Sequence, residues 1–259
     1  MKIATWNING VKARLDNLLT WLKEFKPDIA CLQEIKSLDD QFPRLEIEAL
    51  GYHVETHGQK SFNGVALLSK KSPEEIVRGL PGDESDEQAR FIEGTYCYGK
   101  NIIRVASLYL PNGNPVDSDK YPYKLRWMER LERFTIERLK LEEPFILAGD
   151  YNVIPTALDA KNPTQWEHDA LYLPTTRNAF NRLLNLGLTD AIRAVDDSQL
   201  FSFWDYQAGA WPKDNGIRID HLLLSPEATD KLENAFVQKE LRSWEKPSDH
   251  VPVWISLKT

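Results

Sequence analysis

The sequence predicts an α/β protein built as a sandwich of mixed β-sheets. A strand, a helix and a second strand follow one another at the start of the chain, an order that places parallel strands side by side. Helix followed by strand recurs at 123–149, so the two halves of the chain are similar. No composition break or Ser/Gly-rich linker separates the halves, and we therefore expect residues 1–259 to form a single domain.

The first strand–helix–strand unit is well marked. Residues 2–6 are mostly apolar and predict a buried strand, and apolar side chains at helical spacing predict a helix over 10–26. Pro27 ends this helix, because proline lacks the N–H that a helix interior needs. Residues 28–32 then form the second strand.

The remaining elements are strands joined by turns, together with two further helices. Apolar runs separated by Gly- and Pro-rich turns predict antiparallel strands at 52–57, 64–69, 91–98 and 102–110. Helices are predicted at 123–141 and 177–186. Further short strands are predicted at 145–149, 201–205, 218–224, 236–241 and 252–257. Unusually long irregular segments, which are often functional, occupy 111–122, 155–176 and 207–217.

Composition and charge leave the binding partner open. The chain is 42% hydrophobic and 27% charged, and it contains no run of about 18 apolar residues, so no membrane association is expected. Its start passes directly into a strand without the apolar core of a secretory signal, which predicts a cytoplasmic protein. The net charge of −7 does not indicate a nucleic-acid partner, but carboxylates that hold a metal contribute negative charge of their own.

Polar side chains follow several of the predicted strands. Asn7 and Asn9 follow the first strand, Glu34 the second, and Asp150 with Asn152 the apolar run in the second half. Because the strand ends of an open α/β sheet meet at one edge, we expect these side chains to line one pocket. Carboxylate and amide oxygens are ligands that Mg²⁺ prefers. The sequence therefore predicts an acidic, metal-binding pocket suited to phosphodiester hydrolysis.

Asp150 and Asn152 form the strongest pair. Side chains alternate along a strand, so residues two apart project from one face. The Asp150 carboxylate could hold or deprotonate a water molecule, and the Asn152 amide could bond a phosphoryl oxygen without adding repulsive charge. A simple Gly-Asp turn is the alternative, and the buried apolar run that ends at this aspartate argues against it.

Asp220 needs a partner, because it stands in an apolar run where an unpaired carboxylate would be costly to bury. A histidine would serve, and its cationic imidazole could stabilise charge on a pentacovalent phosphorane. His221 alternates away from Asp220 along the strand, so His250 is the preferred partner. Tyr109 precedes a Pro-Asn-Gly loop, where its phenol could hydrogen-bond a phosphate.

An aromatic-rich segment at 201–211 provides candidates for substrate contacts. Some of its rings are expected in the core, whereas Trp211 stands in a Gly/Ala/Pro setting and is less easily a core residue. Exposed aromatic rings near Lys213 and Arg218 would suit a stacked or flipped nucleotide.

The motifs together resemble a known family. In chain order they are TWNING at 5–10, LQE at 32–34, LYLPNG at 108–113, GDYN at 149–152, RID at 218–220 and SDH at 248–250. The chain resembles the exonuclease III family of apurinic/apyrimidinic endonucleases from residue 3 to residue 257. The segment KPSDHVPVW at 246–254 is especially similar to bacterial exonuclease III.

This resemblance implies a four-layered α/β sandwich of the DNase I-like (endonuclease/exonuclease/phosphatase) kind, with two mixed sheets flanked by helices. It implies a DNA-repair hydrolase that depends on Mg²⁺, with Mn²⁺ as a substitute. We expect this protein to act as a monomer. The expected substrate is double-stranded DNA with abasic sites or 3′ ends. The enzyme would cut 5′ to abasic sites and remove nucleotides or blocking groups from 3′ ends.

The resemblance also implies roles for individual residues. Glu34 would be the main metal ligand, with Asn7 nearby and Asp249 as a further candidate. The catalytic group would comprise Tyr109 on the scissile phosphate, Asp150 at the water, Asn152 on the phosphate, and Asp220 paired with His250. Residues expected at the DNA or in the pocket for the base-free sugar are Asn9, Asn112, Phe203, Trp204, Trp211, Ile217, Arg218 and Ile219. Ile217 stands where some relatives carry a bulkier ring.

Two other functions fit parts of the pattern. Sphingomyelinases and inositol-phosphate phosphatases share the Asp-x-Asn and Ser-Asp-His pieces, so a non-DNA substrate on the same fold is the alternative. The Lys246-Pro247 context and the compact chain favour DNA. A DNA-end-binding protein with a decayed site is disfavoured because every motif residue is present.

Overall fold

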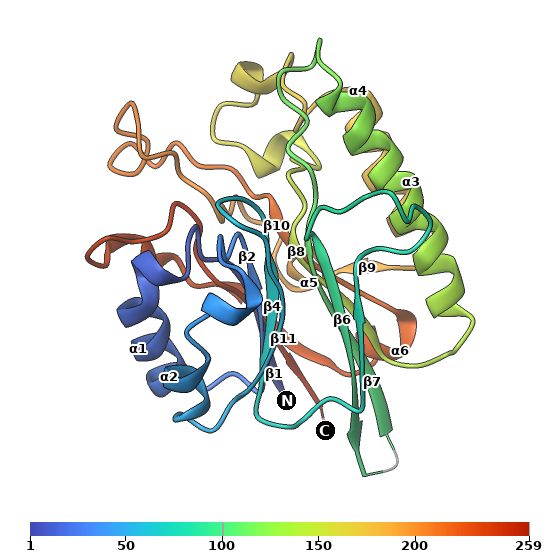
Figure 1. Cartoon of the computed structure of the whole chain (residues 1–259). Coiled ribbons are helices and arrows are strands. Elements are labelled where there is room, and N and C mark those ends of the chain that lie inside the picture. The colour runs from blue at the N-terminus through green and yellow to red at the C-terminus, as the bar shows by residue number, and fades with distance from the viewer. Residues whose placement is uncertain (100, 259) are drawn as a thin grey trace.

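The computed structural model describes residues 1–99 and 101–258, and these form four layers (Figure 1). Two six-stranded sheets pack face to face. Helices α1 (Leu15–Phe25) and α2 (Arg44–Glu48) cover the outer face of one sheet, and α3 (Lys120–Leu139) and α4 (Pro174–Asn185) cover the outer face of the other. The predicted sandwich of two mixed sheets flanked by helices is confirmed.

The first sheet contains both ends of the chain. Its strands, in spatial order, are β11 (Leu232–Val237), β12 (Val253–Leu257), β1 (Lys2–Asn7), β2 (Ile29–Gln33), β4 (Val65–Ser69) and β3 (His53–His57). β1 and β2 are parallel, with Asn7 opposite Gln33, and the other neighbours are antiparallel. The strand–helix–strand unit predicted at the start of the chain is therefore present.

The second sheet repeats this arrangement. Its strands, in spatial order, are β5 (Glu75–Arg78), β6 (Phe91–Tyr98), β7 (Asn101–Tyr109), β8 (Phe145–Asp150), β10 (Asp220–Leu224) and β9 (Thr189–Asp190). β7 and β8 are parallel, with Tyr109 opposite Asp150, and Asp150 also lies opposite Asp220 of the antiparallel β10. The parallel pair of each sheet thus delivers polar residues to one edge.

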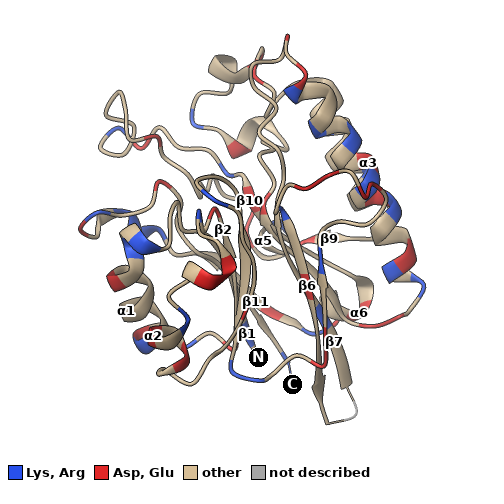
Figure 2. Ribbon diagram, in the orientation of Figure 1, with Lys and Arg blue, Asp and Glu red and all other residues tan. Residues whose placement is uncertain are grey.

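The remaining elements are short. They are helices α5 (Ala191–Val195) and α6 (Pro226–Thr229) and the 3₁₀ turns η1 (Lys12–Arg14), η2 (Asp39–Gln41), η3 (Ala157–Asp159), η4 (Pro163–Trp166) and η5 (Lys239–Ser243). The irregular segments after β7 and β8 lie at the edge opposite to the two chain ends (Figure 1). Acidic and basic residues occur together along both α1 and α3, as Figure 2 shows.

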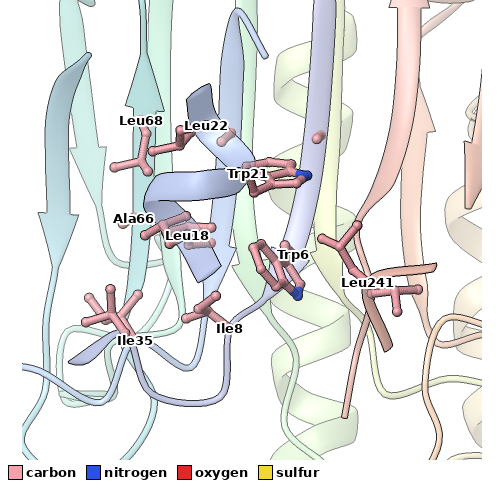
Figure 3. Packing of buried hydrophobic residues seen from close by; sticks show 14 of the residues in the cluster. Trp6, Ile8, Leu18, Trp21, Leu22, Ile35, Ala66, Leu68 and Leu241 are labelled. Carbon is pink, nitrogen blue, oxygen red and sulfur yellow. The ribbon is translucent and has the colours of Figure 1, made fainter. Parts of the chain in front are cut away.

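Three apolar clusters hold the layers together. One fills the space between the sheets, and one lies between each sheet and its helices. In the cluster under α1, Trp6, Trp21 and Leu18 pack against residues of β1, β2 and β4 (Figure 3). Gln238 accepts hydrogen bonds from the indole N–H of Trp21 (3.0 Å) and Trp254 (2.7 Å), so these buried donors are satisfied.

Some predicted elements are wrong. The helix expected over 10–26 is divided into η1 and α1, because Arg14, the last residue of η1, has a non-helical conformation. The segment 201–205 is no strand: Phe203 makes only isolated bridges, to Ile217 on one side and His250 on the other. The strand expected at 236–241 is β11 at 232–237, and the chain then turns into η5, which buries Leu241.

None of the helices in the described residues has both the length and the apolar character needed to cross a membrane.

Replacing Leu18 with alanine tests the packing under α1. Leu18 is fully buried, so Leu18→Ala leaves a cavity and should lower the free energy of unfolding by about 2–5 kcal/mol. Glu24→Ala on the exposed face of the same helix is the control and should change it by less than about 0.5 kcal/mol. Urea denaturation of both variants measures the difference, and equal stabilities would contradict this account of the core.

Candidate active site

The side-chain amide of Asn7 joins the acidic residues of the two sheets. Asn7 Nδ2 donates to Glu34 Oε1 (3.0 Å) at the end of β2 and to Asp150 Oδ2 (2.9 Å) at the end of β8. Asn7 Oδ1 accepts the main-chain N–H of Asn9 (3.0 Å), which fixes the orientation of the amide. Both amide hydrogens of Asn7 are thus donated to carboxylates, while its Oδ1 keeps one lone pair, so its role beside the metal stays a prediction.

The backbone turns sharply where the strands deliver these residues. Asn9, Glu34 and Asn152 all have φ between 47° and 48°, a left-handed conformation that is uncommon outside glycine. Such conformations cluster at functional sites, where the surrounding structure maintains them. Gly149 is required beside Asp150, because a Cβ there would lie 2.0 Å from the main-chain oxygen of Leu108.

His250 is held between two buried aspartates. Its Nδ1 lies 2.8 Å from Asp220 Oδ2, and its Nε2 lies 3.7 Å from Asp150 Oδ2. Ser202 Oγ also donates to Asp220 Oδ2 (2.6 Å). Sequence reasoning paired Asp220 with His250 rather than His221, and the structure places them together.

These contacts decide the charge of the site. Burial alone would lower the pKa of His250, but the carboxylates of Asp220 and Asp150 raise it to about 10, so the imidazole is cationic at neutral pH. Burial raises the pKa of Asp150, and the cationic His250 opposes this rise. The arrangement places a positive imidazole beside a carboxylate that is poised to accept a proton.

Glu34 and Asp249 are the candidate carboxylate ligands for a metal at this edge. The carboxylate of Glu34 is partly exposed, and Asp249 Oδ1 accepts a hydrogen bond from Asn9 Nδ2 (3.1 Å). Lys36 Nζ lies 3.0 Å from Glu34 Oε2, so this oxygen already attracts a cation. Carboxylate oxygens without sulfur ligands fit a hard ion such as Mg²⁺ or Mn²⁺.

A second acidic cluster fits a metal less well. Asp150, Asp220 and His250 are close enough to share an ion. However, the Nδ1 atom of His250 is engaged with Asp220, and a cationic imidazole has no lone pair to offer. Within this trio His250 is thus an ion-pair partner of Asp220 and offers no nitrogen lone pair to a metal.

The phosphate-binding candidates lie at the same edge. Burial, with further contributions from Glu34 and Asp150, holds the pKa of Tyr109 well above its usual value, so its phenol is a hydrogen-bond donor. Asn152 Nδ2 donates to the main-chain oxygen of Leu110 (2.9 Å), and Asn152 Oδ1 accepts from Asn112 Nδ2 (3.1 Å). Each of these two amides keeps one further N–H for a ligand.

The expected sugar pocket is only partly present. Phe203 is half-buried and lies edge-on to His250, with the ring centres 4.9 Å apart, so it can face the reacting centre. Ile217 and Ile219 are each only 2% exposed, and they pack into an apolar cluster with Leu171. The expectation that Trp204 lines this pocket is wrong. The side chain is fully buried, and its indole N–H donates to Asp214.

One further prediction of DNA contact is wrong. Arg218 is 1% exposed and binds Asp159 and Asp190, because a buried guanidinium needs carboxylate partners. It therefore fixes η3 against the second sheet and does not reach a ligand. Trp211 is half-buried and packs edge-on against Trp204, with ring centres 5.0 Å apart, and its contact with DNA stays a prediction.

Several residues at this edge were not predicted from the sequence. Arg90 places its guanidinium 4.9 Å from the centre of the Tyr109 ring. Phe62 is 69% exposed in a polar loop, and an isolated aromatic residue among Lys, Ser and Asn was a signal that could have been used. Lys36 lies two residues after Glu34, whereas nothing in the local sequence marks Ser202 as a partner of Asp220.

Comparison with known proteins identifies the family. The sequence profile of the endonuclease/exonuclease/phosphatase family matches residues 4–250. The chain belongs to this family. It is 34% identical to the exodeoxyribonuclease III of Haemophilus influenzae over 267 residues, which cover 100% of both chains.

Solved structures of family members share the whole fold. A 3′ phosphatase from Neisseria bound to a product DNA hairpin superposes with a TM-score of 0.96 at 35% identity, covering 100% of both chains. An AP endonuclease from Archaeoglobus fulgidus superposes with a TM-score of 0.94 at 34% identity, also over 100% of both chains. The predicted relationship to exonuclease III, the DNase I-like fold and the class of phosphodiester-hydrolysing DNA-repair nuclease are confirmed.

The buried His221 predicts a loss of stability in acid. Burial and Arg218 lower the pKa of His221 to about 4 from the ordinary value of 6.5. The unfolded chain therefore takes up this proton first, and stability should fall as the pH drops from 6.5 towards 4. Between pH 6.5 and 4.5, His221 should contribute a loss of about 2–3 kcal/mol.

His221→Gln provides the comparison. The raised pKa of Asp150 gives a contribution of opposite sign in this range, but it is present in both proteins and cancels in the difference. Denaturant unfolding of wild type and variant at pH 6.5 and pH 4.5 measures the effect. The variant should lose less stability on acidification, and parallel losses would show that His221 does not titrate as expected.

Proposed function

We propose that this protein is a Mg²⁺-dependent DNA-repair nuclease that hydrolyses phosphodiesters at abasic sites and at 3′ ends of double-stranded DNA. The convergence of Glu34, Asp150 and His250, with Asn7 bridging the two carboxylates across the sheets, is the observation that carries this proposal. Because both halves of the chain supply these residues, we also propose that residues 1–259 act as one domain. Action as a monomer in the cytoplasm is part of the same proposal.

Each of these residues has a separate role in an in-line attack of water on phosphorus. Asp150 accepts a proton from the attacking water, and Asn152 and Tyr109 donate hydrogen bonds to the phosphate oxygens. His250, kept cationic by Asp220, stabilises negative charge on the phosphorane. A Mg²⁺ ion held by Glu34, with Asp249 as the further candidate, would supply additional positive charge to the scissile phosphate.

A groove beside the site supports a nucleic-acid substrate. It has a volume of about 570 Å³, and its lining includes Arg90, Lys120, Asn112 and the exposed Phe62. Cations and amides suit a phosphate backbone, and an exposed aromatic ring suits an unstacked base or sugar. A small inositol phosphate would not need a groove whose lining runs from Asn112 to Phe62 and Tyr123.

Two solved relatives indicate which DNA sites this protein would act on. One solved relative is an AP endonuclease and another is a 3′ phosphatase captured with product DNA. Phe203 stands beside His250, where a base-free sugar could enter, whereas Ile217 and Ile219 are covered by their own cluster. We therefore propose activity on both abasic sites and 3′ ends, with the 3′ end demanding less room at this wall.

Substitution of the central residues tests the assignment of the site. Asp150→Asn removes the proton acceptor and His250→Ala removes the cation, and each should lower kcat at least about 100-fold. Steady-state cleavage of duplex DNA measures the loss, and circular dichroism shows whether each variant is folded. The exposed residues Asp16 and His53 provide matched controls, since Asp16→Asn and His53→Ala should cleave like wild type. Turnover close to wild type in either site variant would remove the assignment.

The substrate is tested with one duplex that carries a single abasic analogue and a label at the 5′ end. With Mg²⁺ present we expect a cut at the lesion and a ladder that shortens from the 3′ end. Removal of the metal with EDTA should abolish both, and added Mn²⁺ should restore them. Phosphate release from inositol phosphates, together with intact duplex, would instead support the non-DNA alternative.

A further inference from the structure

A lysine lies buried beneath the candidate active site. Lys124 stands near the start of α3, is 0% exposed, and points its ammonium group at two main-chain oxygens. Its Nζ donates to the oxygen of Asn112 (3.0 Å) and to the oxygen of Asn152 (2.5 Å). Within residues 1–99 and 101–258, no carboxylate lies within 4.0 Å of this nitrogen to form an ion pair. Burial lowers the pKa of Lys124 to about 7, and the more distant carboxylates of Asp150 and Asp169 oppose this shift.

The two carbonyl groups belong to the residues that carry the phosphate-binding amides. Asn112 Nδ2 donates to Asn152 Oδ1 (3.1 Å), so the two side chains already contact each other above the lysine. Asn152 holds a left-handed conformation and donates its main-chain N–H to Asp150 Oδ1 (2.9 Å). Through these two hydrogen bonds, Lys124 links the segment of Asn112 to the segment of Asn152.

The neighbouring loop makes room for this lysine. A Cβ on Gly113 would lie 2.7 Å from Lys124 Cδ and 3.1 Å from the Cβ of Ala170. Gly113 also has a φ of +90°, which other residues rarely adopt. The loop after β7 is thus shaped to pass directly over the aliphatic part of Lys124.

We propose that Lys124 is a positioning residue, which holds the amides of Asn112 and Asn152 at the separation needed to bind the phosphate. It touches neither substrate nor metal and acts through the two main-chain oxygens. This inference rests on the role given to Asn152 in the proposed function. It predicts that the lysine matters for turnover and that its effect depends on the presence of the Asn152 amide.

Lys124→Met removes the two hydrogen bonds and keeps most of the side-chain volume. A displacement of about 1 Å at a reacting group can cost about 100-fold in rate, so we expect kcat to fall about 10- to 100-fold. KM should change less than about threefold, because most of the DNA contact surface is untouched. Lys140→Met, the same change at an exposed position of α3's C-terminal end, is the control and should leave kcat unchanged.

A double-mutant cycle separates positioning from a general loss of structure. In the Asn152→Ala background the amide that Lys124 positions is absent, so Lys124→Met should lower kcat by less than about threefold. The inference is overturned if the loss of kcat in the double variant equals the product of the losses in the two single variants. It is also overturned if Lys124→Met cleaves like wild type. If Asn152→Ala alone cleaves like wild type, the site assignment in the proposed function fails as well.

Folding of the variants is measured by thermal unfolding. If Lys124→Met does not fold, the same cycle is run with Lys124→Gln, whose amide can still donate to one of the two oxygens. The cycle should again be non-multiplicative. Failure of both variants to fold would assign Lys124 to the stability of the fold and overturn its role in positioning.

Discussion

The hydrogen bonds from Asn7 to Glu34 and Asp150 are the contacts on which the rest of the site depends. Each sheet ends in an acidic residue, and two carboxylates facing each other across a sandwich would repel. One amide group between them offers a hydrogen to each and so makes their approach favourable. His250, Asn152 and Tyr109 all lie close to this pair.

The sandwich supplies the rigidity that such a pair needs. Behind it, Gln33 Nε2 donates to Ser107 Oγ (3.0 Å), and Ser107 Oγ donates to the main-chain oxygen of Leu32 (2.9 Å), so the sheets are joined by polar contacts in an otherwise apolar interface. Sites built on strand ends are placed more precisely than sites built on loops alone. The loops add substrate contacts to a centre that the strands have already fixed.

The sequence predicted those features that depend on local pattern. Apolar runs that end in Asn7, Glu34 and Asp150 predicted both the strands and the edge where the strands meet. The alternation of side chains along a strand favoured His250 over His221 as the partner of Asp220. Features decided by tertiary contacts were not accessible. Trp204 and Arg218 are adjacent to site residues in sequence, but packing and buried ion pairs turn them inward. The isolated bridges of Phe203 depend on partners far along the chain, so a strand was wrongly expected there.

The position of the last strand has a consequence for biosynthesis. β12 lies between β1 and β11 in the interior of its sheet, and His250 precedes it by only a few residues. A nascent polypeptide leaving the ribosome can form most of the second sheet early, but it cannot complete the first until β12 has emerged. The ion pair of His250 with Asp220 can therefore form only after residue 250 has been synthesised. A chain that stops before this residue lacks the cation that the proposed mechanism places beside the phosphorane.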